Sequence, residues 1–166
     1  MQGKDLVINM KYTLSVLVEN QPGVLSKVVA LFSRRGFNID SLAVGTTEDE
    51  SISRITMVVN GDEYIIEQVE KQLNKIIPVI KVKNLTKLGD YTASGLILIK
   101  VGCEPKVITE LLHIAKLTEA DVCNVSTKTV TLRLAGEDDK ITTLIEMLKP
   151  YGIKEIVRTG IIAIEK

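Results

Sequence analysis

The sequence predicts an α+β fold of two tandem ferredoxin-like modules, each with the element order βαββαβ, an antiparallel sheet and helices on one face. Three observations support it. Apolar and polar residues alternate in short runs, apolar residues recur at helical spacing between those runs, and the whole order appears twice. A chain of 166 residues is long enough for two modules of about 75 residues each.

The first module is expected at residues 12–86. Tyr12, Leu14, Val16 and Val18 alternate with mostly polar residues, as in a half-buried strand. Gly36 ends the helix that follows, and Asp62 is a plausible N-cap for the next one. The expected elements are a strand at 12–19, a helix from Val24 to Phe32, strands at 38–45 and 53–59, a helix at 65–76 and a strand at 79–85.

The second module is expected at residues 95–166, after a linker at 87–94, and residues 1–11 are read as an N-terminal extension. Its expected elements are a strand at 95–101, a helix at 105–117, strands at 121–125 and 130–134, a helix at 138–148 and a last strand within 153–164. A fixed offset of 75 positions relates Gly61 to Gly136, Ile66 to Ile141, Val69 to Leu144 and Leu73 to Leu148. Thin cores of this size predict self-association, with strand edges pairing between copies.

Composition excludes several functional classes. Lysine plus arginine and aspartate plus glutamate number 21 each, so the chain lacks the basic excess of nucleic-acid binders and polybasic membrane binders. No apolar run approaches the length of a membrane span. Two cysteines, Cys103 and Cys123, cannot form a disulfide framework and indicate a reducing compartment, so we expect a cytoplasmic protein.

The residues that usually carry catalysis are scarce. His113 is the only histidine, and it lies in a helical pattern without a serine or cysteine motif beside it. One histidine and two distant cysteines do not make a zinc site, and the run Glu48–Glu50 lacks the glycine turn of a calcium loop. No phosphate-cradling glycine loop occurs. We therefore expect neither a catalytic residue nor a metal site in this chain.

The turn Asn20–Ser26 is the best candidate for a binding site. Gly23 removes the Cβ that would block a close-approaching group, and helix N-terminal N–H groups suit a carboxylate. Asn20 adds an amide that accepts from an ammonium and donates to an anion. These features suit a free amino acid, although the same residues also make an ordinary strand-to-helix turn. Asn38 either caps the end of the helix or reaches a ligand held against a second subunit.

The segment LSVLVENQPGVLSKVVALFSRRGFNIDSLAVG resembles the start of the small, regulatory subunits of acetolactate synthase (acetohydroxyacid synthase). These subunits begin with an ACT domain, an amino-acid-binding ferredoxin-like module, which would span residues 12–86 here. Residues 53–56, 67–73 and 156–161 extend the resemblance over nearly the whole chain. A departure is that Ala93-Ser94-Gly95 stand where the family usually has an Arg-Glu pair.

The resemblance implies a non-catalytic subunit that works in valine, leucine and isoleucine biosynthesis. It would form a homodimer through its ACT domains, bind and activate a separate catalytic subunit, and confer feedback inhibition by valine. Thiamine diphosphate, magnesium and FAD would belong to the catalytic subunit, with no cofactor in this chain. The alternative is a stand-alone ACT-type sensor that regulates another enzyme or a transcription regulator.

The resemblance also implies the effector contacts, which lie at the interface between two ACT domains. Asn20 would engage the amino-acid head group, and backbone N–H groups near Val24 and Leu25 its carboxylate. The contacts are Asn20, Gly23, Val24 and Leu25 from one chain and Asn38 and Ile39 from its mate, with Ser26 and Gly45 nearby.

Overall fold

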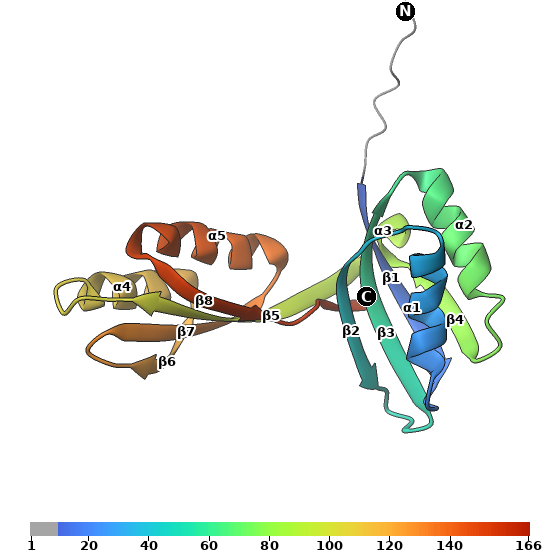
Figure 1. Cartoon of the computed structure of the whole chain (residues 1–166), viewed down its shortest axis with the longest axis horizontal. Helices are drawn as coiled ribbons and strands as arrows, with labels where there is room; N and C mark the ends of the chain where they lie inside the picture. Colours follow the sequence, from blue (N-terminus) through green and yellow to red (C-terminus); the bar gives the residue numbers. More distant parts are fainter. Residues whose placement is uncertain (1–9) are drawn as a thin grey trace, which may run out of the picture. The chain divides into compact units, whose positions relative to one another are not determined.

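The computed structural model describes residues 10–166, and these form two compact units (Figure 1). Unit 1 contains the described residues up to Thr92 together with Ile161–Lys166, and unit 2 is Ala93–Gly160. Most of the expected N-terminal extension, residues 1–9, lies outside the described residues. Met10 and Lys11, the last two residues of that extension, instead begin the first strand.

Unit 1 has the predicted βαββαβ order. Its elements are β1 (Met10–Glu19), α1 (Val24–Arg34), β2 (Ile39–Thr46), β3 (Ile52–Gly61), α2 (Glu63–Leu73) and β4 (Val79–Asn84). The four strands form an antiparallel sheet in the order β2-β3-β1-β4. Strand β2 is therefore an edge strand, with one side of its backbone unpaired within the described sheet.

Both helices of unit 1 cover the same face of the sheet (Figure 1). The alternation in β1 turns Leu14, Val16 and Val18 toward them, and all three side chains are buried. The helices contribute one apolar stripe each to the same core, Val24, Val28 and Phe32 from α1 and Ile66, Val69 and Leu73 from α2. Packing against the core therefore fixes both ends of α1.

The opposite face of this sheet is also partly covered. Thr13 and Ser15 alternate with the core residues of β1 and are nevertheless buried. A short helix, α3 (Leu85–Leu88), and the last strand, β9 (Ile162–Glu165), lie next to β1. Ile161 donates its N–H to Ser41 Oγ at 3.1 Å, and Ala163 is buried.

The boundaries near residues 86–94 and 160 differ from the expected ones. Asn84 accepts a hydrogen bond from Lys87 N, and Gly89 has a left-handed φ of 79°, so part of the expected linker is the capped helix α3. The expected last strand is two strands, and residues 161–166, placed by the sequence in the second module, pack within unit 1. Strand β9 pairs with β5 (Tyr91–Gly102), whose first residues also belong to unit 1.

Unit 2 repeats the fold of unit 1. Its elements are β5 (Tyr91–Gly102, which begins in unit 1), α4 (Ile108–Thr118), β6 (Asp121–Val125), β7 (Thr129–Gly136), α5 (Asp138–Leu148), the 3-10 turn η1 (Lys149–Tyr151) and β8 (Ile153–Arg158). The strand order β6-β7-β5-β8 matches that of unit 1. Ile141, Leu144 and Leu148 of α5 are buried like their partners 75 positions earlier. The predicted fold class is confirmed.

Candidate functional site

Gly23 sets the shape of the turn between β1 and α1. Its φ of 84° lies in the left-handed region, where a residue with a Cβ is strained. A Cβ built at Gly23 meets nothing within 4 Å, so open space lies beside this backbone. Val24, the first helical residue, is 4% exposed and anchors the helix to the core. The turn is thus anchored to the core through Val24 and accessible beside Gly23.

The N-terminus of α1 presents backbone donors. No side chain of the described chain caps this helix, and its first turn carries no acidic residue. The N–H of Lys27 bonds to Gly23 O at 3.1 Å, whereas those of Leu25 and Ser26 have no acceptor among the described residues. Leu25 is 39% exposed, and Ser26 is also exposed. Two neighbouring N–H groups at the positive end of a helix dipole suit a carboxylate.

Asn20 is held by the loop between β2 and β3. Its backbone N–H donates to Ser51 O at 2.7 Å, and its side-chain Nδ2 donates to Glu50 O at 2.8 Å. A backbone carbonyl only accepts, so the amide nitrogen must face the loop and Oδ1 must point away from it. Asn20 therefore presents Oδ1 as an acceptor, which suits an ammonium group, while Nδ2 has a second N–H besides the one that bonds to Glu50 O.

Asp49 organises the loop that holds Asn20. Its Oδ1 accepts from both the N–H and the hydroxyl of Ser51, at 2.9 and 2.6 Å. These two donors, the hydroxyl first, lower the pKa of the Asp49 carboxyl below its ordinary value. The residues of the run Glu48–Glu50 are exposed, and the backbone carbonyl of Glu50 positions the side chain of Asn20.

Asn38 and Ile39 lie where β2 begins. A glycine turn at Gly36, with φ of 69°, ends the preceding helix segment. Asn38 is exposed, and its Nδ2 donates to Asp40 Oδ1 at 3.2 Å. Ile39 is half-buried and packs against the core. Gly45, near the other end of β2, is exposed and a Cβ there meets nothing within 4 Å.

The predicted effector residues form two separate groups within one chain. Ile39 pairs with Val59, which pairs with Tyr12, whereas Asn20 follows Glu19 at the other end of β1. Tyr12 and Glu19 are seven positions apart on the same strand, and at about 3.3 Å per residue this is about 23 Å. A single chain does not bring Asn20 and Asn38 together.

Sequence reasoning missed the residues that orient these amides. Asp40 faces Asn38 from two positions along the chain, a spacing typical of local asparagine and aspartate hydrogen bonds. Glu50 lies 30 positions from Asn20 in the sequence, and no local sequence pattern predicts that its carbonyl accepts from the Asn20 amide. Ser41, which accepts from Ile161, is likewise visible only in the structure.

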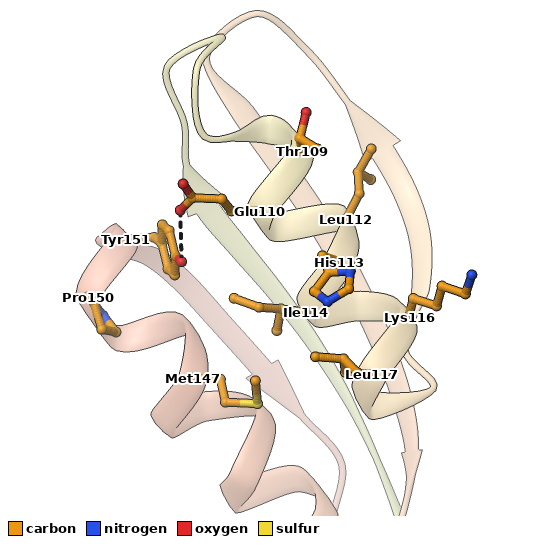
Figure 2. Close-up of a pocket in the computed structure, with 10 residues that line it drawn as sticks. All are labelled: Thr109, Glu110, Leu112, His113, Ile114, Lys116, Leu117, Met147, Pro150 and Tyr151. Atoms are coloured by element: carbon orange, nitrogen blue, oxygen red, sulfur yellow. Dashed lines mark hydrogen bonds between the residues drawn. The ribbon is translucent and has the colours of Figure 1, made fainter.

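Unit 2 contains a shallow groove (Figure 2). One side of the groove is α4, and the other side is the end of α5 together with η1. Leu112, Ile114 and Leu117 of α4 and Met147 of α5 make its lining mainly apolar. Tyr151 donates its hydroxyl to Glu110 Oε2 at 3.0 Å, and this carboxylate raises the pKa of Tyr151. The lining offers no paired nucleophile and base.

The histidine, cysteine and acidic residues of the described chain do not form a recognisable catalytic or metal-binding group. His113 is an exposed residue of α4. Cys103 and Cys123 are both free thiols. Among the described residues, no group of three or more histidine, cysteine or acidic side chains is placed to hold a metal ion. In the part of the chain that the structure describes, no helix is long and apolar enough to cross a membrane.

Comparison with known proteins agrees with this arrangement in both units. The family model described as the AHAS small subunit-like ACT domain matches residues 14–81. A second model, described as the small subunit of acetolactate synthase, matches residues 94–166. The probable acetolactate synthase small subunit of Archaeoglobus fulgidus is 46% identical over 154 residues, which cover 93% of this chain and 96% of that protein.

The chain belongs to the acetolactate synthase small-subunit family. The acetolactate synthase small subunit of Mycobacterium leprae is 45% identical over 155 residues, covering 93% of this chain and 91% of the relative. The crystal structure of the acetolactate synthase small subunit from Thermotoga maritima matches with a TM-score of 0.85 and 34% identity, covering 95% of this chain and 98% of that one. The chain is therefore a regulatory, non-catalytic subunit with an ACT domain.

Proposed function

We propose that this regulatory subunit forms a homodimer through its ACT units and binds valine between them. Without valine, the regulatory subunit activates the catalytic subunit. Bound valine lowers the activity of that complex. The observation that carries the proposal is the separation of the two groups of predicted contacts. Residues that lie at opposite ends of one sheet form a single site only when a second copy supplies one group.

The free edge of β2 supplies a suitable pairing. Two β2 strands that pair antiparallel about a two-fold axis bring the start of one strand to the end of the other. Asn38 and Ile39 of one copy then approach Gly45 and Thr46 of the second. Thr46 pairs with Ser53, and Asn20 bonds to Ser51, so the turn at Asn20 belongs to this same end of the sheet.

The chemistry of the joined groups fits a zwitterion. The N–H groups of Leu25 and Ser26 provide donors for the carboxylate. The Oδ1 atom of Asn20 provides an acceptor for the ammonium, because the bond from Nδ2 to Glu50 O turns the nitrogen toward the loop and the oxygen away from it. Ile39 of the second copy and the exposed part of Leu25 offer an apolar surface to a branched side chain.

Regulation then needs only a difference in affinity. Valine inhibits if it binds more tightly to the dimer arrangement that activates the catalytic subunit less, and a coupling of about 1–3 kcal/mol is sufficient. In this proposal the thiamine diphosphate, magnesium and FAD of the reaction are bound by the catalytic subunit. Both subunits are proposed to work in the cytoplasm. The match over residues 94–166 favours this role over a stand-alone sensor.

The test is co-purification of this chain with the acetolactate synthase catalytic subunit, followed by activity measurements at increasing valine, leucine or isoleucine. We expect a complex that is more active than the catalytic subunit alone and that loses activity with valine. Failure to form a complex with the catalytic subunit, or a complex that no branched-chain amino acid inhibits, would contradict the proposal.

A further inference from the structure

The side-chain amide of Asn38 has a defined orientation. Its Nδ2 lies 3.2 Å from Asp40 Oδ1 and donates to it. An ionised carboxylate only accepts hydrogen bonds, so the opposite orientation, with the two oxygens facing each other, is excluded. Oδ1 of Asn38 is therefore turned away from Asp40, on an exposed residue.

Asp40 is itself held in place. Residues Ile39 and Ser41 pair with Val59 and Val58, so Asp40 is the extra residue of a β-bulge, a feature that redirects a side chain. Its Oδ2 accepts from Asn60 Nδ2 at 2.8 Å, and Lys11 Nζ lies 3.7 Å from the same oxygen. Asp40 is an exposed residue of the edge strand, and its side chain is 22% exposed.

We infer that Asp40 is a positioning residue of the effector site, which fixes the amide of Asn38 so that its Oδ1 accepts from the ammonium group of the bound amino acid. The inference rests on the proposed function, in which Asn38 reaches the site of a second copy. Asn20 and Asn38 are then oriented in the same way. The Nδ2 of each donates a hydrogen bond to an acceptor of the protein, and the Oδ1 of each faces the ligand in this proposal. Asp40 acts through Asn38 and does not contact the effector.

The inference predicts selectivity for the ammonium group. Without Asp40, the Asn38 side chain must be ordered by the ligand, and this cost corresponds to about a fivefold weaker affinity for valine. Isovalerate has the carboxylate and branched chain of valine but no ammonium. Its affinity is therefore expected to be the same in Asp40→Ala and in the unsubstituted dimer.

The experiment measures valine and isovalerate binding by NMR chemical-shift titration, at concentrations where light scattering shows the dimer. The variants are Asp40→Ala, Asp40→Asn and Asn38→Ala, with Lys11→Ala as a control that removes the nearby charge but no hydrogen bond to Asn38. We expect Asn38→Ala to weaken valine binding at least about tenfold, Asp40→Ala about fivefold and Lys11→Ala by less than about twofold. Asp40→Asn keeps an acceptor oxygen beside Asn38, so its loss is expected to be smaller than that of Asp40→Ala.

Three results would overturn the role of Asp40 while leaving the proposed site intact. In the first, Asp40→Ala binds valine normally although Asn38→Ala does not. In the second, Asp40→Ala loses valine and isovalerate equally, as a general distortion would cause. In the third, Asp40→Asn loses as much affinity as Asp40→Ala. If Asn20→Ala and Asn38→Ala both bind valine normally, it is the proposed function that is wrong.

Discussion

Gly23 allows backbone stability and effector binding to be tested separately with two substitutions. In Gly23→Ala the new Cβ meets no atom within 4 Å, so the only cost to the folded chain is the left-handed backbone at φ 84°. That cost is about 1 kcal/mol. For a unit of this size, the melting temperature is expected to fall by about 4–8 °C.

Gly23→Asp adds a charge at the same point. Aspartate tolerates the left-handed region better than alanine does, so its free energy of unfolding is expected to be no lower than that of Gly23→Ala. Its carboxylate competes with that of valine for the N–H groups of Leu25 and Ser26. Two carboxylates about 4 Å apart repel by about 4 kcal/mol at an effective dielectric constant of 20. Solvent screening leaves at least about a hundredfold loss of valine affinity.

Calorimetry measures both quantities, by thermal unfolding and by valine titration of the dimer. We expect Gly23→Ala to lose stability and less than about tenfold in affinity, and Gly23→Asp to lose nearly all binding at similar stability. Unchanged valine affinity in Gly23→Asp would refute the assignment of the carboxylate to this turn. Unchanged stability in Gly23→Ala would refute the strain argument.

Two further predictions concern local structure. Asp62 Oδ1 accepts from Ile65 N at 2.7 Å and caps α2, whereas Glu137, at the equivalent position of unit 2, makes no such bond. Asp62→Ala is therefore expected to cost about 1 kcal/mol in urea unfolding and Glu137→Ala less than about 0.5 kcal/mol, and equal losses would contradict the capping role. The lowered pKa of Asp49 predicts that the loop at Ser51 is stabilised above the ordinary aspartate pKa and that this stabilisation is lost as the pH falls through the folded-state pKa. An NMR titration of the Ser51 amide is expected to show a midpoint below that ordinary value, and a midpoint at or above it would contradict the two hydrogen bonds.

The fold was predictable because it depends on local periodicity. The alternation around Leu14 and Val16 and the stripes ending at Leu73 and Leu148 identify the buried faces without any knowledge of partners. The 75-residue offset adds a second, independent copy of the same pattern. The order of strands in both sheets follows from the split βαβ motif.

The details of the candidate site were only partly predictable. The sequence indicates Gly23 and the amides, because a glycine turn and an uncapped helix have local signatures. It does not indicate that Glu50 O holds Asn20, or that residues 161–166 pack within unit 1, because those contacts join distant segments. Asp40 lies only two residues from Asn38, but the bulge that redirects it depends on pairing with β3.

A site shared between two chains can be tested most directly by complementation. Asn20→Ala and Asn38→Ala subunits, each expected to bind valine only weakly as a homodimer, are unfolded and refolded together. A mixed dimer then contains one site with both asparagines intact, so valine binding is expected to return at about a quarter of all sites in an equal mixture. No recovery of binding in mixed dimers, or full binding by either homodimer alone, would contradict a site built from Asn20 of one chain and Asn38 of the other.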